Sequence, residues 1–288
     1  MKDRLITLGY TAGWRLVRAL PQPVAEALFT GAADRAWKRN GPGTQRLRRN
    51  YQQVVGADMP ETLVRDGLRS YARYWMEAFR LPTRTREQNA AGFHMEDASY
   101  DQMKSAIAEG NGLVLALPHV ANWDAAAAWV VSHDWPMITV AERLKPEAVA
   151  KKFLDYRESL GMRVLSLTGG DRPPLEVLTE HLQKGWVVPL LADRDLSRGG
   201  VEVEFFGGRT RMPAGPAILA IRTGAPIYAV DCWYSEHRVE ARLRKITPPA
   251  EGPLDERVKV TVQQMATAFE AGIREHPQDW HMLQKLWI

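Results

Sequence analysis

The chain has 288 residues, of which 45% are hydrophobic and 25% are charged. These values are ordinary for a globular protein with a sizeable core. Its single cysteine, Cys232, excludes an intramolecular disulfide and fits a reducing compartment. No stretch reaches the roughly 18 apolar residues of a membrane-spanning helix, and no Cys/His cluster has the spacing of a zinc site. The composition therefore argues against a disulfide scaffold, a spanning protein and a structural zinc module.

The charge is distributed unevenly along the chain. The net charge is +4 at pH 7, but residues 1–50 hold ten Lys and Arg against three acidic residues, so this segment is +7 and the rest is −3. A basic end segment indicates an anionic partner, either a membrane surface or a nucleic acid, although a solvated helical face has the same composition. Arg15 and Arg18 interrupt the apolar core that a signal peptide would need, so we expect the protein to stay in the cytoplasm.

The first hundred residues are predicted to be helical. In the first helix an apolar stripe runs beside a basic one, which is the pattern of an amphipathic helix lying at a membrane interface or of a surface helix packed on a core. Pro21 and Pro23 end this helix. The apolar stripe consists of Leu5, Leu8, Ala12, Leu16 and Leu20. Further helices are predicted over residues 24–38, 46–55 and 63–79.

From about residue 110 strands and helices alternate. Strands are predicted over 112–118, 136–142, 162–167 and 186–193, with a short strand or loop over 201–207 and a tightly joined strand pair over 225–235 and 237–246. Helices are predicted over 122–131, 146–160, 173–184, 213–223 and 255–275. Alternation of this kind predicts an α/β fold with a central, mostly parallel sheet flanked by helices. We expect one domain over 1–288, in which 1–100 forms an amphipathic helical part facing a membrane and 110–288 the α/β core.

Polar side chains gather where the predicted strands end. His119 and Asp124 follow the first strand, Glu142 and Arg143 follow the next, and Asp193 with Arg194 closes a later one. Ligands bind outside the carboxyl ends of the strands in open parallel sheets. We therefore expect these side chains and Arg157, on the helix between, to meet at one edge.

His119 and Asp124 form an H-x4-D pattern. If Asn122 caps the following helix, Asp124 falls in its first turn and can reach back to one imidazole nitrogen of His119. The other nitrogen can then act as a general base on an acceptor hydroxyl. An acidic residue in the first turn of a helix is also favoured by the helix dipole alone, so the pattern by itself is weakly specific. The amide groups of the helix N-terminus can hold an oxyanion or a phosphate.

Other catalytic schemes lack their motifs. The sequence contains no G-x-S-x-G elbow for a serine esterase, and no Walker A loop or G-x-G-x-x-G fingerprint for a nucleotide. Cys232 falls inside a predicted strand and is expected to be buried and inert.

The ordered set of motifs resembles the glycerolipid acyltransferase superfamily that carries H-x4-D/E. The motifs are LRRNYQQV (47–54), SYARYWMEAFRLP (70–82), PHVANWD (118–124), DRD (193–195), the FFG at 205–207 with Pro213 after it, and HPQDWHMLQKLW (276–287). They are most similar to the branch of lipid A acyltransferases and phosphatidylinositol mannoside acyltransferases, and they cover nearly the whole chain. An Asp in the motif and an amphipathic start, in place of a Glu and a spanning helix, favour the mannoside side of that branch.

The resemblance implies roles for six residues. His119 would be the general base and Asp124 its orienting acid. Arg157 would lie near the thioester or headgroup, Asp193 would be a site carboxylate, and Glu142 would line the acceptor pocket. Arg194 would bind a phosphate or pair with Asp193 or Asp195. The plainer alternatives are a solvated helix face for Arg157 and a salt bridge for Glu142.

The implied reaction moves a palmitoyl-type acyl chain from acyl-CoA to a mannose hydroxyl of phosphatidylinositol mannoside, by direct attack of the hydroxyl on the thioester. Acyl-CoA would be a co-substrate, and no metal or other cofactor is expected. The protein would lie on the cytoplasmic face of an anionic membrane as a peripheral protein. Alternatives are lipid A or another glycolipid as acceptor, and a non-catalytic lipid-binding protein. Nucleic-acid binding is disfavoured, because the aromatic residues fall on helical apolar stripes and are not interleaved with basic ones.

Overall fold

The computed structural model describes residues 12–142, 147–195 and 199–288. Residues 1–11 of the predicted first helix lie outside the described residues. Residues 12–19 are described and are helical. Trp14 is buried against the rest of the protein, whereas Leu16 is exposed. Across the described residues, no helix is long and apolar enough to cross a membrane.

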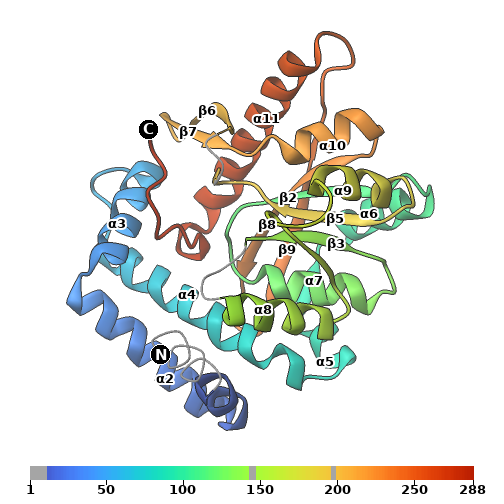
Figure 1. The fold of residues 1–288 in the computed structure, drawn as a ribbon. Helices are drawn as coiled ribbons and strands as arrows, with labels where there is room; N and C mark the ends of the chain where they lie inside the picture. The colour runs from blue at the N-terminus through green and yellow to red at the C-terminus, as the bar shows by residue number, and fades with distance from the viewer. Residues whose placement is uncertain (1–11, 143–146, 196–198) are drawn as a thin grey trace.

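Three helices follow along one side of the molecule, drawn in blue to cyan in Figure 1. They are α2 (Gln22–Arg39), α3 (Pro42–Val55) and α4 (Glu61–Arg80). Their starts are set by Pro21 before α2, Pro60 before α4 and Pro42 at the first position of α3, where the missing proline N–H costs no helical hydrogen bond. These helices confirm the sequence prediction, with ends displaced by a few residues.

The central sheet has five strands in the order β1-β9-β8-β2-β5. Three of its four pairings are parallel, and β8 with β9 forms the predicted antiparallel pair. The strands are β1 (Phe93–Met95), β2 (Leu113–Leu117), β5 (Val187–Leu191), β8 (Ile227–Tyr234) and β9 (Val239–Ile246). All five residues of β2 are buried, as expected for a strand covered on both faces. The predicted α/β class is confirmed.

Two smaller ladders flank this sheet. The first pairs β3 (Ile138–Ala141) with β4 (Arg163–Ser166) in parallel, and an isolated bridge from Met137 to Val187 brings this ladder beside β5. The second is an antiparallel hairpin of β6 (Val201–Phe205) and β7 (Gly208–Met212).

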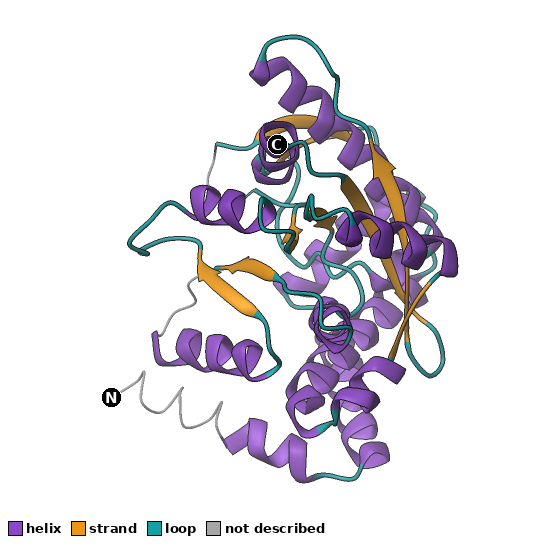
Figure 2. Ribbon diagram, turned by 90° about the vertical axis from the view of Figure 1, so that its right-hand side faces the viewer, coloured by secondary structure: helices purple, strands orange, loops and turns teal. Residues whose placement is uncertain are grey.

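Helices cover both faces of the strands. In Figure 1 α10 and α11 lie above the strands, and α7 and α8 lie below them; Figure 2 turns the molecule by 90° and shows the strands in orange among the helices. The remaining elements are α5 (Arg86–Ala91), α6 (Asp97–Ala108), α7 (Trp123–Ser132), α8 (Glu147–Ser159), α9 (Pro174–Leu182), α10 (Gly215–Thr223), α11 (Leu254–Glu275), and the short 3-10 turns η1 (Leu81–Thr83) and η2 (Pro277–Asp279).

Two strands were not anticipated from the sequence. The three-residue β1 lies within the part expected to be wholly helical, and it joins the central sheet beside β9. The other, β7, pairs with β6 around Phe206 and Gly207, whose φ angles are 49° and 71°. The three residues of β1 are too few to show a period of two, and β7 contains a single apolar side chain, Met212, so neither has the apolar pattern of a strand.

Candidate active site

The register of the two central strands brings His119 beside Asp193. Strands β2 and β5 are parallel neighbours in which Leu117 pairs with Leu191. His119 and Asp193 each lie two residues beyond that pair, at the carboxyl ends of their strands. Because paired positions of adjacent strands share one face, the two side chains meet although 74 residues separate them in sequence.

The Asp193 carboxylate accepts three hydrogen bonds. Its Oδ1 lies 2.6 Å from His119 Nδ1, and its Oδ2 accepts from the His119 backbone N–H at 2.9 Å and from the Trp280 indole N–H at 3.0 Å. The side chain is fully buried. Burial by itself would raise the pKa of Asp193, but the neighbouring His119 and these hydrogen bonds outweigh it and hold the pKa below its ordinary value. Asp193 is therefore an ionised acceptor.

This contact determines which nitrogen of His119 is basic. A carboxylate can only accept, so His119 Nδ1 carries the proton and Nε2 keeps its lone pair. The side chain of His119 is 27% exposed and faces a large cavity. Within the described part of the chain Nε2 has no hydrogen-bond partner. The imidazole is thus oriented to accept a proton from a molecule in that cavity.

Asp124 does not contact the imidazole as the H-x4-D spacing had led us to expect. Its Oδ1 accepts from Arg157 Nε at 2.8 Å, and its Oδ2 accepts from the Tyr74 hydroxyl at 3.1 Å. Asn122 caps α7 as predicted, by accepting from the Ala125 N–H at 3.0 Å. That cap places Asp124 in the first helical turn, where its buried carboxylate points toward α8 and α4. In the structure the carboxylate that contacts the imidazole is that of Asp193, and Asp124 instead holds Arg157.

Glu142 and Arg194 face each other across the cavity mouth. Arg194 Nη2 lies 3.8 Å from Glu142 Oε2, and the Glu142 side chain is 54% exposed. Arg194 therefore pairs with Glu142, and not with Asp193 as one alternative had it. At this exposure the attraction between the two charges is weak, so either group can exchange its partner for a ligand.

One face of α4 supports both sides of the site. Ser70, Tyr74 and Glu77 follow one another at i, i+4 and i+7, so their side chains lie on a common face. Tyr74 donates to Asp124, and Glu77 accepts from the capping residue Asn122 at 2.9 Å. Ser70 donates to the buried Asp279 at 2.6 Å. The aromatic string around residues 70–82 thus positions α7 and the C-terminal segment.

The C-terminal segment passes directly behind His119. The carbonyl of His119 accepts from the His281 backbone N–H at 2.8 Å, and the Ala121 N–H donates to the Asp279 carbonyl at 2.9 Å. Ala121 has a φ of 43°, a left-handed conformation that a non-glycine residue adopts at a cost. These two backbone bonds hold the turn that presents the imidazole.

The other motifs hold this C-terminal segment in place. From α3, Asn50 donates to the Met282 carbonyl at 2.6 Å and Tyr51 to the Trp280 carbonyl at 3.0 Å. The rings of Phe205 and Phe206 lie 6.0 and 6.1 Å from the Trp280 ring. Since Trp280 donates to Asp193, the strings LRRNYQQV, FFG and DWH act together to orient the His119–Asp193 pair.

A cavity of about 560 Å³ opens beside the imidazole. Its volume is in the range of small-molecule sites. At its polar end it is lined by His119, Asp124, Glu142, Arg157 and Arg194, which the sequence had grouped at one edge, and by Asp195. Most of the remaining lining is apolar, and representative residues are Met95, Met103, Ala127, Trp129, Met137, Met162, Leu178 and Leu219. The site thus joins a basic nitrogen and several charges to a long apolar interior.

Sequence reasoning missed two contributors to the site. Trp280 lies in the C-terminal string that carries the family resemblance, but no spacing predicts its contact with Asp193, 87 residues away. Tyr74 lies in the string SYARYWMEAFRLP at 70–82, and its hydrogen bond to Asp124 joins residues 50 apart. Both contacts depend on helix and strand packing that no local pattern encodes.

Comparisons with known proteins show the family of the chain. A model of the family described as bacterial lipid A biosynthesis acyltransferases matches residues 2–288. A phosphatidylinositol mannoside acyltransferase of Mycolicibacterium smegmatis is 50% identical over 98% of this chain and 91% of that protein. A phosphatidylinositol mannoside acyltransferase of Mycobacterium tuberculosis is 46% identical over 97% of this chain and 87% of that protein. The chain therefore belongs to the family of bacterial lipid A biosynthesis acyltransferases.

Proposed function

We propose that this acyltransferase moves a palmitoyl-type acyl chain from acyl-CoA to a mannose hydroxyl of a phosphatidylinositol mannoside. The observation that carries the proposal is the His119–Asp193 pair. His119 Nε2 has no hydrogen-bond partner among the described residues and faces a large, mainly apolar cavity. The acceptor is inferred from the names of the two mycobacterial relatives.

The chemistry follows from the tautomer of His119. Nε2 takes the proton of the mannose hydroxyl, and the oxygen attacks the thioester carbonyl carbon. When the tetrahedral intermediate collapses, the carbon–sulfur bond breaks, and the imidazolium returns the proton to the departing thiolate. The Asp193 carboxylate stabilises the imidazolium between these steps. In this scheme acyl-CoA is the co-substrate. Because all proton transfers pass through His119, the chemistry calls for no metal or other cofactor.

The remaining charged residues would bind the substrates. Arg157, held by Asp124 at 2.8 Å, keeps further guanidinium N–H groups for an anionic or carbonyl oxygen. Glu142 would accept hydrogen bonds from sugar hydroxyls, and Arg194 would meet a phosphate once it leaves Glu142. The apolar interior would hold the acyl chain, since each buried methylene contributes about 0.8 kcal/mol.

We further propose that the protein lies on an anionic membrane through its N-terminal helices. In the described part of the first two helices, Leu16, Val24 and Leu28 are 56%, 50% and 53% exposed. The same region is the +7 segment of the chain. Exposed apolar residues beside basic ones suit an interface where lipid phosphates meet acyl chains. Stronger co-sedimentation with anionic than with neutral vesicles, reduced in Leu28→Glu, would support this.

The proposed reaction is tested by mass spectrometry of purified protein incubated with palmitoyl-CoA and a panel of glycolipids. Wild type is compared with His119→Ala and with Asp134→Asn, a control at an exposed carboxylate away from the cavity. Acylated phosphatidylinositol mannoside from wild type and the control only is the expected result.

Other results would change the proposal in specific ways. Acylation of lipid A or another glycolipid would keep the reaction and replace the acceptor. Equal product from His119→Ala would refute the base. Tight lipid binding with no product from any acceptor, unaffected by His119→Ala, would favour a non-catalytic lipid-binding protein.

A further inference from the structure

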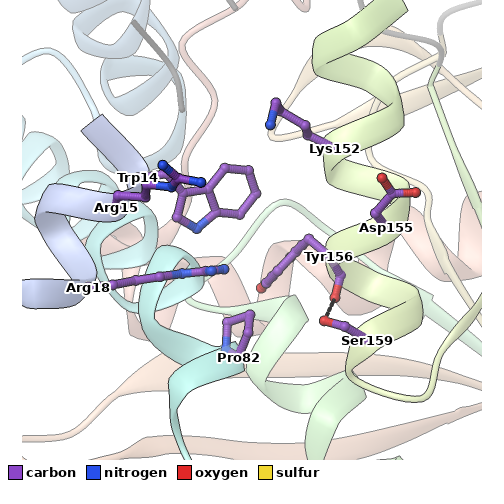
Figure 3. Close-up of a pocket in the computed structure, with 8 residues that line it drawn as sticks. All are labelled: Trp14, Arg15, Arg18, Pro82, Lys152, Asp155, Tyr156 and Ser159. Carbon is purple, nitrogen blue, oxygen red and sulfur yellow. Dashed lines mark hydrogen bonds between the residues drawn. The ribbon is translucent and has the colours of Figure 1, made fainter. Parts of the chain in front are cut away.

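A second pocket, of about 320 Å³, lies between the N-terminal helix and α8. Figure 3 shows Arg15 and Arg18 reaching into it from the N-terminal helix, with Lys152 and Tyr156 on α8 opposite. None of these four residues lines the cavity at His119. The pocket is therefore separate from the proposed site of acyl transfer.

The pocket carries a surplus of positive charge. Arg15, Arg18 and Lys152 are cationic, and the acid in its wall, Asp155, is paired with Lys151 at 2.7 Å. Arg15 and Lys152 have no ion pair or hydrogen bond with any other residue that the structure describes. Burial lowers the pKa of Arg18, so its charge is held at some cost where it stands. An anion in the pocket would offset that cost.

Arg18 is held in one orientation by contacts that occupy one of its guanidinium nitrogens, Nε. Its Nε donates to the Phe79 carbonyl at 2.9 Å, and the indole of Trp14 donates to the same carbonyl at 3.0 Å. The guanidinium also lies 5.2 Å from the Trp14 ring centroid, a cation–π contact. These contacts fix the Arg18 side chain, and its two terminal nitrogens have no hydrogen-bond partner among the residues that the structure describes.

A buried hydroxyl supplies an independent sign of a ligand. The side chain of Tyr156 is only 5% exposed, yet its Oη has no hydrogen-bond partner among the described residues. Buried polar groups are nearly always hydrogen-bonded, so an unpaired hydroxyl needs an explanation. Figure 3 shows this hydroxyl directed toward Arg18 across the pocket. Because burial raises the pKa of Tyr156 well above its ordinary value, the group is a neutral donor.

We propose that this pocket binds the phosphate group of a phosphate ester, held by Arg15, Arg18 and Lys152 and by the hydroxyl of Tyr156. Four donors that converge from two helices suit a tetrahedral anion with several acceptor oxygens, and arginine is well matched to phosphate. The proposed acyl-transfer chemistry makes no use of these residues, whereas the choice between sources of the phosphate rests on the substrates of the proposed function.

The position of the pocket beside the apolar cavity favours two sources of the phosphate. The ring of Trp14 lies 5.3 Å from that of Phe153, and Phe153 lines the apolar cavity. A phosphate beside Trp14 would therefore lie next to the cavity, outside its apolar interior. The phosphate can belong to the nucleotide portion of an acyl thioester or to the phosphodiester of a lipid headgroup. The two sources share the same chemistry and differ in the molecule that carries it.

Isothermal titration calorimetry of the full chain tests the proposal with two soluble probes, coenzyme A and glycerophosphoinositol. The variants are the double substitution Arg15→Ala/Lys152→Ala and the single substitution Tyr156→Phe. Lys104→Ala, which removes an exposed positive charge on α6, is the matched control. We expect the double variant to weaken binding at least about tenfold and Tyr156→Phe about three- to tenfold. Because Tyr156→Phe removes a hydroxyl that has no hydrogen-bond partner among the described residues, the variant should remain folded.

The binding results distinguish the two phosphate sources and can overturn the proposal. Weakening confined to coenzyme A supports a nucleotide phosphate, and weakening confined to glycerophosphoinositol supports a lipid phosphodiester. Binding that is unchanged in Arg15→Ala/Lys152→Ala overturns the proposal, as does the absence of binding by both probes or an equal loss in Lys104→Ala. Binding is the readout, so these results stand whether or not acyl transfer is detected.

Discussion

Replacing each of the two buried carboxylates by its amide separates their roles. In Asp193→Asn the amide oxygen can take the place of Oδ2 and keep the bonds from the His119 N–H and the Trp280 indole. The amide NH2 then faces His119 Nδ1, which must accept. The imidazole proton moves to Nε2, and the base is lost.

The magnitude follows from that change of tautomer. A wrong tautomer in the related serine-hydrolase arrangement lowers kcat by about 10⁴, and we expect a loss of about 10³- to 10⁴-fold here, or about 4–5 kcal/mol of transition-state stabilisation. KM should change little, because Asp193 is fully buried and does not touch the substrates.

Asp124→Asn should behave differently. It removes the charge that pairs with Arg157, whose side chain is only 16% exposed. We expect the free energy of unfolding to fall by about 3 kcal/mol, because a partly buried cation loses its partner. KM should rise, while kcat should stay within about tenfold of wild type.

Steady-state kinetics and thermal unfolding of both variants, with Asp134→Asn as the exposed-carboxylate control, provide the measurement. A large kcat loss in Asp193→Asn, without a matching loss of stability, is the expected pattern. If Asp124→Asn instead lost kcat as completely as His119→Ala while Asp193→Asn kept it, Asp124 would be the orienting acid and the reasoning would be refuted.

Three further predictions concern the support of the site and its cavity. Ser70→Ala removes the donor to Asp279 Oδ1 at 2.6 Å, while Oδ2 keeps its bond from the Tyr234 N–H. The buried Oδ1 left without a donor should lower the free energy of unfolding by about 1–3 kcal/mol; an unchanged melting temperature would contradict this. Burial, followed by the charge of His119, lowers the pKa of His281 to about 3. Since the unfolded chain binds a proton near pH 6.5, the free energy of unfolding should decrease as pH falls from about 6.5 to 3, by up to about 1.4 kcal/mol per pH unit. Denaturant titrations at several pH values measure this dependence, and His281→Gln should make it weaker. The same pH dependence in His281→Gln and wild type would contradict the prediction. Ala127→Phe places a ring in the cavity wall, so competition between acyl-CoA chain lengths should shift toward shorter chains, and no shift would mean that the acyl chain lies elsewhere.

Local patterns were enough to locate most helices and strands. The alternation from Gly112 onward predicted β2, α7, β5 and the β8–β9 pair, because helices and strands differ in the period of their apolar residues. The cap at Asn122 was also predictable, since it depends on residues within one turn. The same local information placed His119 at the end of a strand, where a parallel sheet exposes side chains to ligands.

The order of the strands in the sheet could not be predicted from the sequence. Nothing near His119 says that β5 lies beside β2, and the spacing of Asp124 offered a nearer carboxylate. Only the assembled sheet, with Leu117 paired to Leu191, brings Asp193 to the imidazole and leaves Asp124 to Arg157. The reason is that periodicity encodes contacts within one element, whereas register between strands is decided by packing across the whole core.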